Sequence, residues 1–214
     1  AGQTFVNVTL TPVDDTRVEG NETAIFTILP NASYDIGTNS GTKITIFDND
    51  GTLLNATADA YVRDGTSAGT NFGASPQLEV KKASSGFNRQ TYLKFHIDTL
   101  STINTAKLRL FGRLTAADGA GIATSVFGSN VTNWSESALN FNNRPATTGS
   151  ALATTTITDT TARFYEWDIT AFLKAQKAAG KTVVTLVLTN LVNSSQFVTF
   201  NSREAGNGPQ IIVG

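Results

Sequence analysis

The 214-residue chain has no cysteine, no methionine and a single histidine, His96. The lack of cysteine excludes disulfides, thiolate metal sites and cysteine nucleophiles, and it permits an oxidising or a reducing compartment. Charged residues are scarce, at 15% of the chain with a formal net charge of −1, so there is no general basic footprint for nucleic acid. No apolar run reaches the roughly 18 residues that span a bilayer. We therefore expect neither a nucleic-acid partner nor a membrane span.

Recognisable catalytic patterns are missing as well. His96 lies in a segment that alternates like a strand, and no Ser–Asp partnership surrounds it, so a hydrolase triad is unsupported. Phosphate-binding glycine loops, zinc-ligand spacings and dinucleotide fingerprints are absent. We therefore expect a protein that is not an enzyme.

The residues that are abundant, namely Thr, Ser, Asn and Gly, suit short strands joined by tight turns and are common in exported adhesive proteins. The chain begins at Ala1 rather than at methionine. We expect a processed or excised piece of a protein that is extracellular or on the cell surface.

Alternation of apolar and polar residues predicts strands throughout the chain, beginning with 5–11, 24–29 and 43–47. After Ala58, further strands are expected at 59–63, 77–82, 90–97, 106–113, 122–127, 163–169, 182–189, 196–202 and 210–213. One helix is expected at 170–179, with Thr170 as N-cap and Gly180 as the stop, and a long loop at 136–150. Many short strands separated by turns indicate an all-β sandwich or jelly roll.

Acidic residues gather at two places in the first fifty residues. Four fall within one interstrand loop and two follow the strand at 43–47: Asp14, Asp15, Glu19 and Glu22, then Asp48 and Asp50. Calcium is bound by six to eight oxygen ligands, and a cation relieves the mutual repulsion of clustered carboxylates. The pattern predicts a calcium site, with a merely solvated acidic turn as the alternative.

The same segment, TPVDDTRVEGNETAIFTI followed by GTKITIFDND, resembles the C-terminal half of a Calx-β domain over residues 5–50. The resemblance implies a partial immunoglobulin-like sandwich in which those six acidic residues are calcium ligands. We assign residues 1–50 to this partial domain and 51–55 to a hinge that calcium would stiffen.

Residues 56–214 resemble the DNRLRE domain family, whose studied relatives include alginate-binding carbohydrate-binding modules. The resemblance is carried by ATADAYVRDGTSAGTNFG, GFNRQTYLKFHI, AKLRLFGR, NWSESALNFNNRPA, YEWDIT and VTFNSREAGNGPQIIV. It implies a β-jelly roll that binds polysaccharide. Asp59, Asp64 and Asn71 are candidates for the second calcium site that such jelly rolls often carry, although turn capping explains them nearly as well.

A candidate ligand face follows from the alternation. In 90–97, Leu93, Phe95 and Ile97 point to the core, while Tyr92 and Lys94 point the other way. In 106–113, the residues facing away from the core are Lys107, Arg109, Phe111 and Arg113. If the two strands pair, they form one basic and aromatic face that suits an acidic polysaccharide. The alternative is a solvent face with charges that prevent aggregation.

Two roles remain open for the residues near this face. Arg203 either joins the ligand site or forms an ion pair with Glu204. Trp134 either stacks on a ligand or packs beneath its loop, whereas Trp167 is expected in the core.

Two functions are consistent with these patterns. The first is a non-catalytic, extracellular, calcium-dependent module that binds polysaccharide. The second is a structural subunit of a fibre or adhesin, in which a neighbouring subunit completes the partial first domain by strand addition and the copies associate head to tail.

Overall fold

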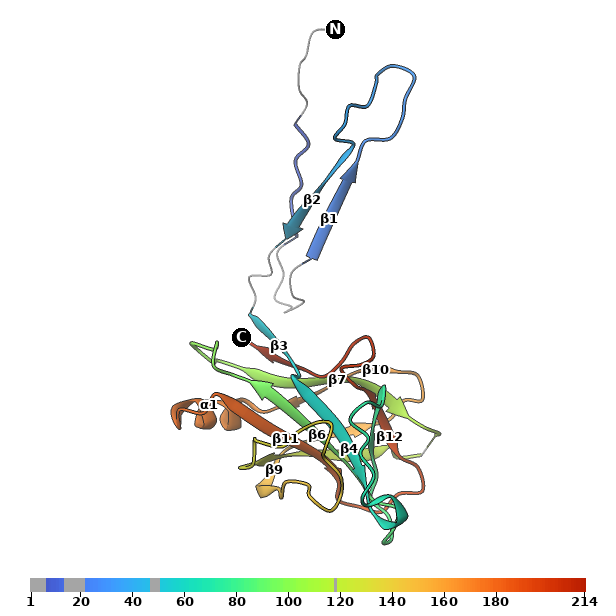
Figure 1. Cartoon of the computed structure of the whole chain (residues 1–214), viewed down its shortest axis with the longest axis vertical. Helices are drawn as coiled ribbons and strands as arrows, with labels where there is room; N and C mark the ends of the chain where they lie inside the picture. Colours follow the sequence, from blue (N-terminus) through green and yellow to red (C-terminus); the bar gives the residue numbers. More distant parts are fainter. Residues whose placement is uncertain (1–6, 14–21, 47–50, 118) are drawn as a thin grey trace. The chain divides into compact units, whose positions relative to one another are not determined.

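The computed structural model describes residues 7–13, 22–46, 51–117 and 119–214, and it divides the chain after Gly51 into two units (Figure 1). The first unit comprises residues 1–51 and the second comprises residues 52–214. Each unit has its own sheets, and each is described by itself.

The described strands of the first unit form a two-stranded antiparallel ribbon of β1 (Glu22–Thr27) and β2 (Gly41–Ile46). The register places Ala24 opposite Ile44 and Glu22 opposite Ile46, so one face of the ribbon carries the side chains of Ala24, Phe26, Ile44 and Ile46. Ile44 is 41% exposed there. A ribbon of two strands is only marginally stable without a second layer against its apolar face.

The strand predicted at 5–11 is wrong over its described part, because residues 7–11 have no regular secondary structure. Val8 is 73% exposed and Leu10 is 39% exposed. Alternation shows only that a segment can form an amphipathic strand. A strand also needs a partner, and none pairs with residues 7–11 within the described residues.

The second unit is a sandwich of two antiparallel sheets, which confirms the all-β class. One sheet has five strands in the order β4-β6-β11-β8-β9. Their bounds are β4 (Ala58–Arg63), β6 (Arg89–His96), β8 (Ile122–Ser129), β9 (Thr148–Ile157) and β11 (Val183–Asn190).

The other sheet has six strands, with β7 at its centre. Its strands are β3 (Thr52–Asn55), β5 (Gln77–Val80), β7 (Ala106–Leu114), β10 (Arg163–Asp168), β12 (Val198–Asn201) and β13 (Gln210–Val213). β7 pairs with β13, β12 and β10. The segment 51–55, predicted to be a hinge, is largely β3. The β3 backbone pairs with β13, Leu54 opposite Ile211, so residues 52–55 belong to the second unit.

The main core lies between the two sheets and is filled by inward residues of both. Leu93, Phe95 and Ile97 are fully buried there, as the alternation of β6 predicts. Trp167 is also in this core, as predicted: it is 1% exposed, and its Nε1 donates a hydrogen bond to the Thr124 carbonyl at 2.8 Å.

The structure differs from the prediction at two other elements, β9 (Thr148–Ile157) and the helix. β9 falls partly in the expected loop 136–150, and its Thr-rich sequence suits a strand because Thr is β-branched. Helix α1 (Thr170–Ala178) begins as expected, but Ile169 is its N-cap, and the Thr170 hydroxyl instead bonds the backbone of Ala106. Within the described ranges, no helix has the length and apolar character needed to cross a membrane.

Candidate functional site

The strongest candidate surface lies on the outer side of the six-stranded sheet. Because Leu108 and Leu110 of β7 point into the core, the intervening side chains point outward. β10 pairs with β7 so that Phe164 lies opposite Phe111 and Glu166 opposite Arg109. We call the following set the cationic-aromatic face: Lys107, Arg109, Phe111, Arg113 and Phe164.

Aromatic rings hold the central arginine of this face in place. The Arg109 guanidinium carbon lies 4.0 Å from the centre of the Phe164 ring. Phe164 in turn packs edge-on against Phe111, with ring centres 5.0 Å apart and an angle of 65° between the rings. Arg109, Phe111 and Phe164 are all half-buried. The guanidinium is therefore oriented before any ligand arrives. Sequence reasoning missed Phe164, although the alternation in RFYEWD would have placed it outward.

The basic residues of the cationic-aromatic face differ in how far their charge is already compensated. Lys107 Nζ forms a salt bridge with Glu166 Oε2 at 2.9 Å. Arg113 donates only a long hydrogen bond, 3.4 Å, to the Thr160 carbonyl. Among the described residues, neither Arg109 nor Arg113 has a carboxylate oxygen within 4.0 Å. Within the described residues both guanidinium groups thus lack an anionic partner, although Arg109 Nε itself is buried. The two residues lie about 13 Å apart along one strand at roughly 3.3 Å per residue.

Tyr92 and Lys94, predicted to share this face, lie on the other sheet. β6 and β7 do not pair: β6 pairs with β4 and β11, whereas β7 pairs with β10, β12 and β13. The segment between them buries Leu100 and Ile103 in the core as the chain crosses from one sheet to the other. The shared face was predicted on the condition that these two consecutive strands pair, a condition that alternation alone cannot establish.

Tyr92 and Lys94 instead anchor a loop that covers the five-stranded sheet. Tyr92 is 1% exposed, its hydroxyl donates to the Pro145 carbonyl at 3.0 Å, and burial raises its pKa to about 12. Lys94 Nζ donates to the Trp134 carbonyl and lies 4.6 Å from the centre of the Trp134 ring. Burial also lowers the pKa of Lys94. Trp134 is 8% exposed and packs in a small second core, so packing accounts for it.

Arg203 forms ion pairs, the second of the two roles considered for it. Its Nη1 lies 2.9 Å from Glu136 Oε2 and 3.3 Å from Glu204 Oε1. The backbone N–H of Arg203 donates to Asp59 Oδ2 at 2.8 Å, and the Asp59 N–H donates to Glu136 Oε1 at 2.7 Å. These bonds join β4, the loop around Glu136 and the turn after β12.

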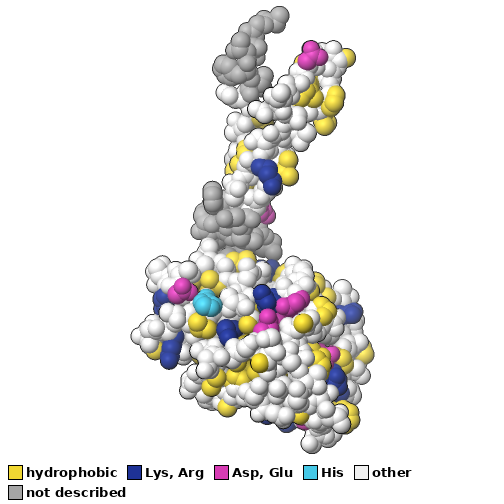
Figure 2. All heavy atoms as spheres, viewed as in Figure 1, with side chains coloured by type: hydrophobic (Ala, Val, Ile, Leu, Met, Phe, Trp, Pro, Cys, Tyr) yellow, Lys and Arg dark blue, Asp and Glu magenta, His cyan; other side chains and the backbone are white. Residues whose placement is uncertain are grey.

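On the side of residues 52–214 drawn in Figure 2, several basic side chains lie next to acidic ones.

The second calcium site predicted at Asp59, Asp64 and Asn71 is not assembled. Asp64 accepts hydrogen bonds from the N–H groups of Gly86 and Asn88, at 2.9 and 2.7 Å. Burial opposes ionisation, but these bonds and the Asn88 side chain lower the pKa of Asp64 overall. Asn71 Nδ2 donates to the carbonyls of Glu136 and Leu139. The side chains of Asp64 and Asn71 thus bond separate turns, and no group of three His, Cys, Asp or Glu side chains that could hold a metal ion occurs within the described parts of the chain.

The predicted first calcium site falls largely outside the described residues, which include neither Asp14, Asp15 and Glu19 nor Asp48 and Asp50. Glu22 is described: it begins β1, is exposed and lies opposite Ile46. Calcium binding by these six residues stays a prediction.

The burial of Asp59 predicts that the stability of the second unit depends on pH. This residue is fully buried, and burial raises its pKa to about 7, helped by the charges of Glu204 and Glu136 and opposed by the Arg203 N–H. In the unfolded chain the pKa returns to about 4. The folded state therefore binds the extra proton between about pH 4 and 7, and the stability that Asp59 contributes is lost as the pH rises through this range.

The variant Asp59→Asn keeps an acceptor for the Arg203 N–H and cannot ionise. From pH 5 to pH 8 we expect the unfolding free energy of the wild type to fall relative to that of the variant, because only the wild type ionises at this position. Urea unfolding followed by tryptophan fluorescence measures it, since both tryptophans lie in the second unit. A difference that does not change with pH would contradict the assignment.

Comparison with known proteins gives a match to the profile of carbohydrate-binding module family 96 over residues 51–214. A gellan lyase from Bacillus sp. is 26% identical over 178 residues, which cover 81% of this chain and 7% of that protein. The chain therefore spans a small fraction of that relative's length. A solved structure of the CBM22-1 and GH10 modules of endo-1,4-beta-D-xylanase 10B from Clostridium thermocellum, complexed with xylohexaose, is 9% identical. The match covers 75% of this chain and 28% of that one, with a TM-score of 0.32.

Proposed function

Since the chain belongs to carbohydrate-binding module family 96, we propose that it binds an acidic polysaccharide through the cationic-aromatic face. The observation that carries the proposal is Arg109, whose guanidinium is held on the Phe164 ring without a carboxylate partner among the described residues. Arg113, further along β7, also has no carboxylate partner among the described residues.

The chemistry of the face fits such a ligand. A guanidinium group binds a carboxylate through two parallel hydrogen bonds, and a charge-assisted bond of this kind is about twice as strong as a neutral one. The Phe111 and Phe164 rings offer apolar area to the C–H faces of sugars. A neutral polysaccharide would use the rings but leave both guanidinium groups without their counter-charge.

The comparisons support a binding role rather than catalysis and an extracellular location. The matched family is one of binding modules. The similar gellan lyase is many times longer than this chain, and we propose that this chain is a sugar-binding part of a larger secreted protein.

The test compares a polymer with its own uncharged form. Polygalacturonate and carboxyl-reduced polygalacturonate share a backbone and differ in their carboxylates. We expect isothermal titration to give at least about tenfold weaker binding to the reduced polymer, and binding to the acidic polymer that weakens as salt screens the charges. Equal binding to both polymers would contradict the acidic preference, and binding to neither would contradict the proposal for this ligand class.

A second candidate function is assembly, and the ribbon of the first unit favours it. The face formed by Ala24, Phe26, Ile44 and Ile46 has no second layer among the described residues, and Ile25 on the opposite face is 68% exposed. Ribbons with open edges and an apolar face add strands from another chain. We propose that a second copy provides this layer and that calcium, bound by the acidic residues of the first unit, strengthens it.

Light scattering on the full chain, first with calcium and then with chelator, tests this second candidate. Oligomers that form in calcium and dissociate with chelator are expected if a second copy covers the ribbon. A monomer of unchanged mass under both conditions would contradict both the assembly and its dependence on calcium.

A further inference from the structure

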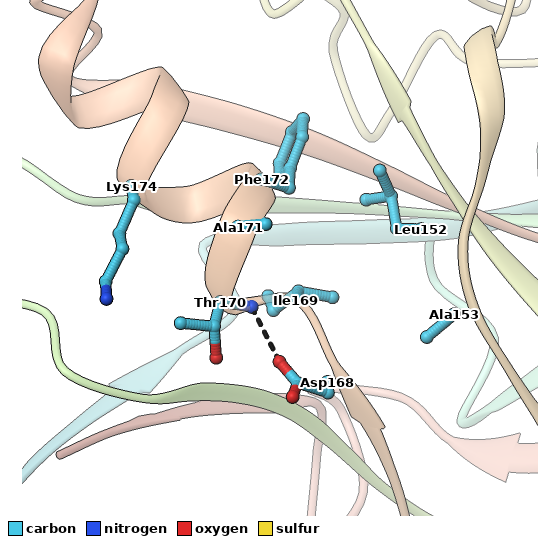
Figure 3. A pocket seen from close by; sticks show the side chains of 8 residues that line it. All are labelled: Leu152, Ala153, Asp168, Ile169, Thr170, Ala171, Phe172 and Lys174. Carbon is cyan, nitrogen blue, oxygen red and sulfur yellow. Dashed lines mark hydrogen bonds between the residues drawn. The ribbon is translucent and has the colours of Figure 1, made fainter.

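A cleft of about 510 Å³ lies beside the first turn of α1, where the helix meets β9 (Figure 3). Its volume is within the range of roughly 300–1,000 Å³ that is usual for small-ligand pockets. Figure 3 shows the side chains of Phe172 and Leu152 on either side of the opening and Asp168 below the helix. The full lining is Leu152, Ala153, Asp168, Ile169, Thr170, Ala171, Phe172 and Lys174.

The apolar wall of this cleft is fixed in position. Phe172 packs on Gly128 of β8, where even one added Cβ atom would lie 2.6 Å from Cε2 of the ring. The pairing of β8 with β9 shifts its register between Val126 and Gly128. Such irregularities commonly re-aim side chains next to binding sites. Phe172 and Leu152 therefore present a pre-formed apolar surface at the edge of the core.

The charged side chains that line the cleft are one carboxylate, Asp168, and one ammonium group, Lys174. Asp168 Oδ1 accepts a hydrogen bond from the Thr170 N–H at 2.9 Å. The hydrogen bonds from Thr170 lower the pKa of Asp168, so it is a carboxylate at neutral pH. The lining therefore has no net formal charge, and Asp168 already occupies the Thr170 N–H at the start of α1, so the cleft favours a neutral ligand group. It suits a group with hydroxyl donors and an apolar C–H face.

The cleft adjoins the cationic-aromatic face through Asp168. This residue lines the cleft and, at the end of β10, lies opposite Lys107 of β7. From Lys107 to Arg113 the face extends about 20 Å along the strand, at roughly 3.3 Å per residue. A polymer that follows β7 would therefore reach a partly apolar cleft without net formal charge after passing two guanidinium groups.

We propose that the cleft is a second sugar subsite, which takes a neutral hexopyranose residue of the same polysaccharide whose acidic residues lie on the cationic-aromatic face. The inference rests on the proposed function and adds to it: the ligand is a heteropolymer that contains both neutral and acidic sugars. Phe172 and Leu152 contact the ring, and Asp168 accepts hydrogen bonds from its hydroxyl groups.

The experiment uses pairs of small probes that differ only at C6, which carries a hydroxymethyl group in the neutral sugar and a carboxylate in the acidic one. Methyl glucoside, methyl galactoside and methyl mannoside, and the corresponding methyl glycosides of glucuronic, galacturonic and mannuronic acid, are titrated to about 50 mM into the ¹⁵N-labelled full chain. This concentration reaches weak ligands with dissociation constants well above 1 mM. We expect at least one neutral glycoside to shift the amide signals of Thr170 and Ala171, and the acidic ones to shift those of Arg109 and Arg113.

Two variants separate the subsite from a non-specific effect. Ala171→Phe fills the mouth of the cleft from an exposed position, and Ala175→Phe makes the same change one turn further along α1, at an exposed position outside the lining. We expect Ala171→Phe to weaken binding of the neutral glycoside at least fivefold, Ala175→Phe to leave it unchanged, and neither to alter the response at Arg109.

The outcomes distinguish this inference from the proposed function. If the acidic glycosides shift Arg109 and Arg113 but no neutral glycoside shifts the cleft, the subsite is wrong and the acidic face stands. The subsite is also wrong if Ala171→Phe binds the neutral probe as the wild type does. If neither kind of probe shifts either surface, both proposals fail.

Discussion

Replacing Arg109 by alanine is expected to lower the affinity for an acidic polysaccharide by about tenfold or more. A hydrogen bond to a charged group contributes roughly 1.5–3 kcal/mol, and 1.4 kcal/mol corresponds to a factor of ten in a dissociation constant. Because the Phe164 ring already orders the Arg109 side chain, binding costs little conformational entropy there. Among the described residues Arg109 also has no ion pair that the ligand would have to break. Isothermal titration with polygalacturonate measures the change.

Arg163→Ala is the matched control for this variant. Arg163 lies on β10, the strand that pairs with β7. Like Arg109, it stacks on an aromatic ring, with its guanidinium carbon 4.9 Å from the centre of the Tyr165 ring. It differs in having a carboxylate partner, Asp159, at 2.6 Å. We expect the control to bind like the wild type. Arg109→Lys should retain only part of the affinity, because lysine keeps the charge but loses the planar fork. Wild-type affinity in Arg109→Ala would show that the ligand lies elsewhere.

Trp134→Ala is expected to destabilise the second unit by about 3–5 kcal/mol, the range for truncating a large buried aromatic side chain. The Trp134 Nε1 donates to Thr185 Oγ1 at 3.0 Å, and its ring packs edge-on against Tyr92 with centres 6.4 Å apart. Without the indole, the loop that carries Leu139 and Pro145 loses this hydrogen bond and ring contact with the five-stranded sheet. Urea unfolding followed by the fluorescence of Trp167 measures the loss.

Phe87→Ala is the control for Trp134→Ala, because Phe87 is an aromatic residue in a turn but is 61% exposed. A change of less than about 0.5 kcal/mol is expected there. Trp134→Phe should fall between the two, since it keeps a ring but leaves the Thr185 hydroxyl without its donor. If Trp134→Ala weakened sugar binding while leaving stability unchanged, Trp134 would be a ligand platform rather than a core residue.

The sequence by itself determined the all-β class, the inward residues of β6 and the outward residues of β7. Alternation is a local property, because successive side chains of a strand point to opposite faces whatever the strand pairs with. It therefore placed Leu93 and Phe95 in the core and Arg109 outside it correctly. The resemblance of residues 56–214 to polysaccharide-binding domains also agrees with the matched family.

Only the tertiary structure decided which outward residues meet and which of them remain accessible. Tyr92 points away from the main core, as predicted, but the loop at Trp134–Pro145 covers it. Lys94 and Arg109 lie on different sheets because the chain crosses the sandwich between β6 and β7. Phe164 reaches Arg109 from a strand more than fifty residues away. Pairing and covering depend on contacts between segments that are distant in the chain, and alternation within one strand contains no information about them.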